Sequence, residues 1–311
     1  MATAQHETSK SLVAPSSPIL PLELEREIFE LAAQERGRIP ALLRVARRVH
    51  TWIQPLLFRV IRAADTRTWT RFLQTAQSTP ELIAKNLRFL CIDNNISSAD
   101  YFTVISTMQR IEDLVLPAFG LATTGTTPLS ELAYLRRLAG SPAHLRLAIG
   151  SPGARFPSLT HLELMDLLDG PARTNAQYDS WKALMLVPTL THLSNPNPDH
   201  ISWSIVQKLL EDMPGLTMLM AVYSEDDAWR YFHEINAGDI RDNRFLAGTY
   251  VNAEENAWRE WERAANGVAL DYWDRADAFL ERKRKGAVHA TRRWVDDWIY
   301  EAEEDDDLPS P

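Results

Sequence analysis

Near its N-terminus the chain reads LPLELEREIFEL from Leu20 to Leu31. Pro21 stands at a helix start, where its missing N–H leaves no hydrogen bond unmade. Leu24, Ile28 and Leu31 then recur at helical spacing, with Phe29 beside them. This stretch therefore predicts a short amphipathic helix with one apolar face.

Two further apolar segments follow this predicted helix. The second runs from Leu42 to Ile53, and after Pro55 a third short piece runs from Leu56 to Ile61. We interpret the whole stretch as three short helices. About forty residues of this kind bury too little apolar surface to fold alone. The unit is therefore expected to pack on the rest of the chain, on a partner protein, or on both.

The order of residues here resembles the F-box, the helical motif through which substrate receptors of ubiquitin ligases bind their adaptor. The resemblance, greatest to F-box-like proteins of mushroom-forming fungi, is carried by Leu20-Pro21, Glu23-Leu24, Ile28-Phe29, Leu42-Leu43, Val45-Ala46-Arg47-Arg48 and Trp52-Ile53. It implies docking on a Skp-type adaptor and, through it, on a cullin complex. The adaptor contact or its supporting core would be held by Leu20, Pro21, Leu24, Ile28, Val45 and Trp52. The alternative is a helical cap that binds no partner.

A second pattern, L-x-x-L-x-L or a shortened form of it, recurs further along the chain. It begins at Leu87, Ile111, Leu135 and Leu159 in steps of 24 residues, then at Leu190 after 31 and at Leu216 after 26. A period of 20–29 residues is typical of leucine-rich repeats, in which each repeat supplies one short strand of a solenoid. The alternative is an α/β domain with evenly spaced parallel strands. Either way we expect a mixed α/β fold.

The residues between these leucines are expected to face the concave side of a solenoid and to form its protein-binding surface. The candidates are Phe89, Asp113, Arg137, His161, Glu163, His192 and Met218. His161 and His192 occupy equivalent places in two Leu-Thr-His-Leu segments, with Glu163 nearby. Similar residues at repeat positions explain them more simply than a metal site, so we predict no metal.

Helices are predicted over 65–73, 98–108, 175–187 and 201–213. From Glu225 onward the chain is rich in Trp and charged residues and is expected to be helical, with helices over 276–284, ending at Gly286, and over 289–301. The expected organisation is a disordered start (1–17), the F-box-like module (18–62), a degenerate leucine-rich solenoid (63–224), a Trp-rich helical segment (225–300) and a disordered acidic tail (301–311).

Composition excludes several classes of protein. Hydrophobic residues make up 45% of the 311 residues and charged residues 24%, as in ordinary globular proteins. No apolar run approaches the length of a membrane span, and the N-terminus lacks the apolar core of a signal peptide. Cys91 is the only cysteine, which rules out an internal disulfide and favours the cytoplasm or nucleus. The net charge of −9 disfavours nucleic-acid binding.

Catalytic motifs are missing from the sequence. It contains no phosphate-binding glycine loop, no G-x-S-x-G and no H-E-x-x-H. We therefore expect no catalytic residues and no cofactor, and a non-catalytic receptor that presents a protein substrate to a cullin-type ubiquitin ligase. The alternatives are a repeat scaffold without ligase coupling and an enzyme with an unrecognised site, for example a glycosidase using the acids among the C-terminal tryptophans.

Overall fold

The computed structural model describes residues 20–92, 105, 107–116, 129, 132–140, 156–165, 182–196, 203–237, 240–250 and 254–296. Most of the helices predicted over 98–108 and 175–187, and both predicted disordered termini, lie outside these ranges. The chain divides into an N-terminal unit, residues 1–54, and a C-terminal unit, residues 55–311. Each unit is described by itself.

The N-terminal unit is helical, as the apolar spacing predicts. It contains α1 (Leu22–Ala32), the 3-10 helix η1 (Arg36–Arg38), α2 (Ile39–Leu42) and the first part of α3 (Arg47–Leu57). Pro21 is the N-cap of α1. Arg48 on α3 donates to the Glu25 carboxylate on α1 at 2.7 and 3.1 Å, which ties the two helices together. No residue of α1 is buried.

The third predicted helix, over Leu56–Ile61, is wrong. The helix α3 passes through Pro55 and ends at Leu57, and Val60–Ala63 forms strand β1. Val60 and Ile61 are β-branched and fit a strand that is buried on both faces. The predicted domain boundary after residue 62 therefore falls inside a strand of the C-terminal unit.

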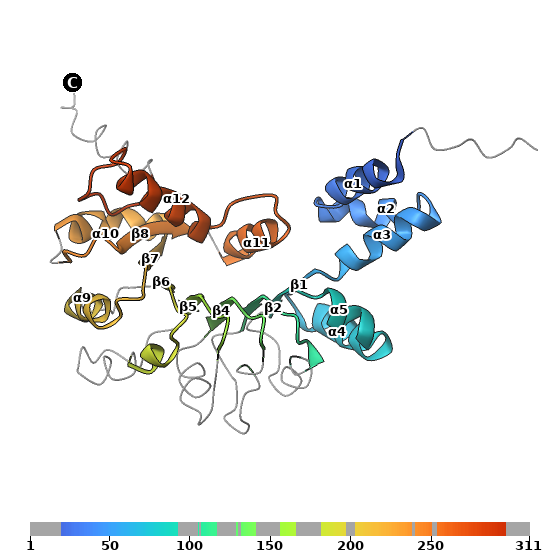
Figure 1. The fold of residues 1–311 in the computed structure, drawn as a ribbon, viewed down its shortest axis with the longest axis horizontal. Coiled ribbons are helices and arrows are strands. Elements are labelled where there is room, and N and C mark those ends of the chain that lie inside the picture. Colours follow the sequence, from blue (N-terminus) through green and yellow to red (C-terminus); the bar gives the residue numbers. More distant parts are fainter. Residues whose placement is uncertain are drawn as a thin grey trace, which may run out of the picture. The chain divides into compact units, whose positions relative to one another are not determined.

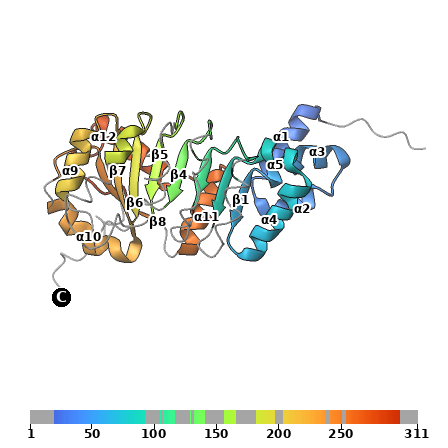
Figure 2. The same ribbon diagram turned by 90° about the horizontal axis from the view of Figure 1, so that it is seen from below.

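The C-terminal unit is built on one parallel sheet, which confirms the mixed α/β class. Its eight strands follow each other in chain order (Figures 1 and 2). They are β1, β2 (Phe89–Ile92), β3 (Asp113–Val115), β4 (Arg137–Gly140), β5 (His161–Leu164), β6 (His192–Pro196), β7 (Met218–Ser224) and β8 (Phe245–Tyr250). Strands β2 to β7 stand where the recurring leucine pattern predicts them.

The repeated leucines pair with one another across the sheet. In register they are Leu90, Leu114, Leu138, Leu162, Leu193 and Leu219, and the row is extended by Ile61 at one end and Phe245 at the other. All of these side chains are buried in one apolar core. Each strand therefore buries its leucine against the strands before and after it.

One face of the sheet packs on helices that lie between the strands in sequence. They are α4 (Thr66–Ser78), α5 (Pro80–Asn86), the 3-10 helix η4 (Ala183–Leu186), α9 (Trp203–Asp212) and α10 (Glu225–Ala237). The helices predicted over 65–73 and 201–213 are confirmed as α4 and α9. Asp65 caps α4 by accepting the Thr68 N–H at 2.6 Å.

The opposite face of the sheet carries α11 (Glu254–Ala265) and α12 (Tyr272–Arg284), drawn above the strands in Figure 1. The predicted helix over 276–284 is part of α12, and Gly286 after its end adopts the left-handed conformation, with φ 73°. The purely helical prediction for 225–300 is wrong, because β8 lies inside it. The predicted helix over 289–301 is also wrong for its described residues, since Trp294 forms a β-bridge with Ala247.

Candidate functional site

The helices α11 and α12 cover the strand face that the sequence predicts to be an open binding surface. Met218 is fully buried, and Phe279 and Trp273 of α12 belong to the same apolar cluster. Trp258 and Trp261 of α11 pack against Cys91, Val115 and Ala139. The prediction of an exposed concave row is therefore wrong for Met218 and for the residues beneath α12. The physical reason is that these aromatic side chains need an apolar face to bury.

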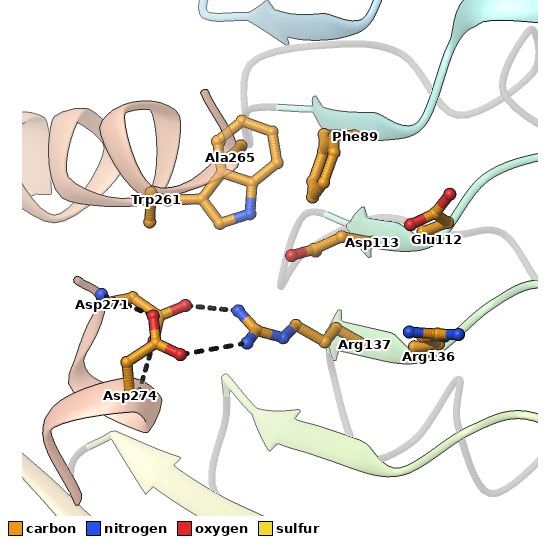
Figure 3. A pocket seen from close by; sticks show the side chains of 10 residues that line it. Phe89, Glu112, Asp113, Arg136, Arg137, Trp261, Ala265, Asp271 and Asp274 are labelled. Carbon is orange, nitrogen blue, oxygen red and sulfur yellow. Dashed lines mark hydrogen bonds and ion pairs between the residues drawn. The ribbon is translucent and has the colours of Figure 1, made fainter. Parts of the chain in front are cut away.

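A cavity of about 250 Å³ remains between this cover and the strands (Figure 3). Three residues of the predicted surface line it, namely Phe89, Asp113 and Arg137. The other lining residues are Glu112, Arg136, Trp261, Ala264, Ala265, Asp271 and Asp274. The predicted surface residues therefore fall into two groups. Those on β2 to β4 line the cavity, and those on β5 to β7 lie beneath α12.

One side of the cavity is closed by ion pairs. Arg137 on β4 donates to Asp271, the N-cap of α12, and its second terminal nitrogen lies 3.8 Å from Asp274. Asp271 also accepts the backbone N–H of Asp274 at 2.9 Å, which completes a capping box. The start of α12 is thus fixed to the sheet through the Arg137 guanidinium.

The other side of the cavity offers polar groups to a ligand. The Asp113 carboxyl is only 6% exposed, and burial raises its pKa to about 7, against the lowering effect of Arg137. The indole N–H of Trp261 faces this carboxyl in Figure 3 and, like Arg137, opposes the rise in its pKa. Phe89 adds an aromatic wall. A guest that accepts from Trp261 and hydrogen-bonds Asp113 would pair with both groups.

A buried polar chain pins α12 to β5 and β6. The Tyr272 hydroxyl donates to the Glu163 carboxylate at 2.8 Å, and Ser194 lies 3.0 Å from the same hydroxyl. Because the phenol proton goes to Glu163, Ser194 donates to Tyr272. Burial raises the pKa of Glu163 to about 7, although the bond from Tyr272 opposes the rise.

This pKa shift predicts a pH-dependent effect of replacing Glu163 by glutamine. A carboxyl whose pKa is raised on folding stabilises the fold below its unfolded pKa, near 4.5, and loses that contribution as pH rises through about 7. The amide oxygen can still accept from Tyr272. We expect E163Q to be as stable as the wild type at pH 4.5. At pH 8 its free energy of unfolding should be about 1–3 kcal/mol higher than that of the wild type, because the wild type then buries a charged carboxylate. Urea titration at both pH values measures this, and an equal effect at the two pH values would contradict it.

A second candidate site is the apolar face of the N-terminal unit. Leu24 is 49% exposed, Ile28 54% and Val45 57%. Of the other predicted adaptor residues, Leu20 and Pro21 are exposed and Trp52 is half-buried. Leu22 and Leu31 are also exposed on α1, although the F-box resemblance does not assign them to the contact. Large apolar side chains gathered on one short helix are typical of a surface that a partner covers.

Comparisons of the sequence with protein-family models and curated proteins, and of the fold with solved structures, find no match. Among the described residues, no helix combines the length and the apolar character that crossing a membrane requires. The site geometry and the sequence patterns therefore carry the functional argument.

Proposed function

We propose that this chain is a non-catalytic substrate-recognition subunit of a Skp–cullin–F-box ubiquitin ligase, acting in the cytoplasm or nucleus. The observation that carries the proposal is the exposure of Leu24, Ile28 and Val45. These are positions to which the F-box resemblance assigns the adaptor contact. A partner that covered them would remove from water the apolar surface that the isolated unit leaves exposed.

Charge supports the same kind of partner. From Pro18 to Arg62 the chain has eight arginines and five glutamates, although the whole chain carries a net charge of −9. A net-positive N-terminal unit suits an acidic adaptor, chiefly by accelerating the encounter. The exposed side chains of Leu24, Ile28 and Val45 would then supply most of the affinity, because exposed ion pairs contribute little.

The parallel sheet supports the second half of the proposal, a degenerate leucine-rich solenoid that binds the substrate. Strands in chain order with their leucines in register are the arrangement that such repeats produce. We propose that a protein segment enters the cavity lined by Phe89, Asp113 and Trp261. A side chain that pairs with the Trp261 N–H and the Asp113 carboxyl would be recognised there.

The alternative is a leucine-rich-repeat scaffold without ligase coupling. In that function the N-terminal helices only cap the fold, and Leu24 and Ile28 should be buried. Within the N-terminal unit both side chains are about half exposed, at 49% and 54%, and binding to a Skp-type adaptor distinguishes the two functions.

Co-purification tests the proposal as a whole. The untagged full chain, mixed with a purified Skp-type adaptor and a cullin, is expected to elute as one complex of all three. A folded chain that elutes alone would contradict the ligase function.

A variant of the cavity tests substrate recognition. When W261L replaces the wild-type chain, a substrate that is ubiquitinated through this chain is expected to lose its modification, while the variant still binds the adaptor. Unchanged modification would place recognition elsewhere.

A further inference from the structure

Two histidines and one carboxylate converge under α12, away from the cavity. His161 on β5 and His192 on β6 are directly paired across the parallel strands. Their rings stack with centroids 4.1 Å apart and an angle of 8° between the planes. Asp277, on the first half of α12, places a carboxylate oxygen 3.1 Å from Nε2 of His192. The three groups therefore come from three different elements.

Hydrogen bonds orient both rings. Nδ1 of His161 lies 2.8 Å from the hydroxyl of Thr160, and Nδ1 of His192 lies 2.7 Å from that of Thr191. Each threonine hydroxyl also lies within reach of a backbone carbonyl, that of Arg136 for Thr160 at 3.3 Å and that of Thr160 for Thr191 at 3.2 Å. Nε2 of His192 donates to Asp277 at 3.1 Å. When a metal ion replaces that proton, Nδ1 can donate to the threonine oxygen while the threonine donates to the carbonyl, which turns Nε2 into a ligand atom.

These three donors have the composition and proximity of a transition-metal site. The ligand atoms of His161, His192 and Asp277 all lie within 4.8 Å of one another. Imidazole nitrogen and carboxylate oxygen are the common non-cysteine ligands of Zn²⁺. Metal-bound histidines usually donate their other N–H to a fixed acceptor, and the hydroxyls of Thr160 and Thr191 stand at that place here. We propose that His161, His192 and Asp277 bind a divalent transition-metal ion of the Zn²⁺ class.

The donor set suits a metal ion by its chemistry. A metal binds the deprotonated forms, a neutral imidazole nitrogen and a carboxylate oxygen, and the cluster supplies both. Trp273 stands edge-on to both rings, with centroids 5.2 and 5.9 Å away, and shields one side of the site.

Coordination requires a small adjustment. The lone pairs of two stacked rings run nearly parallel, so each ring must turn about its Cβ–Cγ bond until both Nε2 atoms point at one ion, at about 2.0–2.1 Å. The Asp277 side chain is 54% exposed and can move to complete a three-ligand set, with water in the fourth position. An ion held in this way would fasten α12 to β5 and β6.

Calorimetric titration of the untagged, EDTA-treated full chain with Zn²⁺ tests the proposal. The wild type is expected to bind one equivalent, with Co²⁺ giving the visible absorption of a four-coordinate site. D277A should weaken binding at least tenfold, and H192A should abolish it. The matched control is E281A, which removes an exposed acid one turn further along α12 and should change the affinity less than twofold.

A second readout excludes surface binding. Zn²⁺ is expected to raise the thermal midpoint of the wild type and of E281A but not that of D277A, because a ligand bound to the native state stabilises it by mass action. No heat of binding for the folded wild type, or equal affinities for D277A and E281A, would overturn the proposal. Neither result depends on adaptor binding, so the experiment tests the metal site independently of the ligase function.

Discussion

Replacement of Trp273 by alanine is expected to lower the free energy of unfolding by about 3–5 kcal/mol, the usual cost of removing a large buried aromatic side chain. Trp273 is only 5% exposed and belongs to the apolar cluster that joins α12 to Met218, Met220 and Leu246. It also stands edge-on to His161. Its loss would leave a cavity between α12 and the sheet that neighbouring side chains cannot fill.

Guanidinium denaturation of the full chain measures this loss. The control is L270A, two residues before α12 begins, where the side chain is 63% exposed and a change within about 0.5 kcal/mol is expected. If the two variants lost equal stability, α12 would not cover the sheet in solution. The concave row would then be open, as the leucine spacing alone suggests.

The second large effect is expected on adaptor binding. The double variant L24D/I28D should weaken binding to a Skp-type adaptor at least 100-fold. Each aspartate would place an unpaired carboxylate in an apolar contact, which costs several kcal/mol in a buried interface, whereas about 2.7 kcal/mol already corresponds to 100-fold. Because α1 contributes no buried residue, the fold should survive both substitutions.

Biolayer interferometry with immobilised adaptor gives the affinities, and circular dichroism checks the fold. The control is L186D, which places the same charge at an apolar side chain that is 65% exposed in the C-terminal unit. It should bind like the wild type. Equal affinities for L186D and L24D/I28D would contradict the assignment of α1 to the contact.

The sequence predicts the middle of the sheet well because the signal there is local. Leu114 and Leu162 lie in strands whose leucines recur at a fixed period, and each pairs in register with its neighbours. The sequence does not predict the end strands β1 and β8, because this local signal is absent there. Val60–Ala63 lacks the leucine pattern, and in β8 Phe245 takes the place of the repeated leucine. Strand formation there depends on pairing with the neighbour rather than on a motif.

The two candidate sites differ in the same way. Leu24 and Ile28 can be singled out from sequence because a helical apolar row in a segment too short to fold alone needs a partner. The cavity cannot be predicted, because Arg137 and Asp271 lie 134 residues apart in the chain. Trp258 and Trp261 do show helical spacing, but nothing in that spacing says which face of the sheet they cover.

Hydrogen–deuterium exchange of the full chain, with and without a purified Skp-type adaptor, tests the central claim most directly. The account predicts slower amide exchange over Leu22–Ala32 and around Val45 when the adaptor is added, with unchanged exchange in β4 to β7. Unchanged exchange in α1 at saturating adaptor, or protection confined to the strands of the sheet, would contradict it.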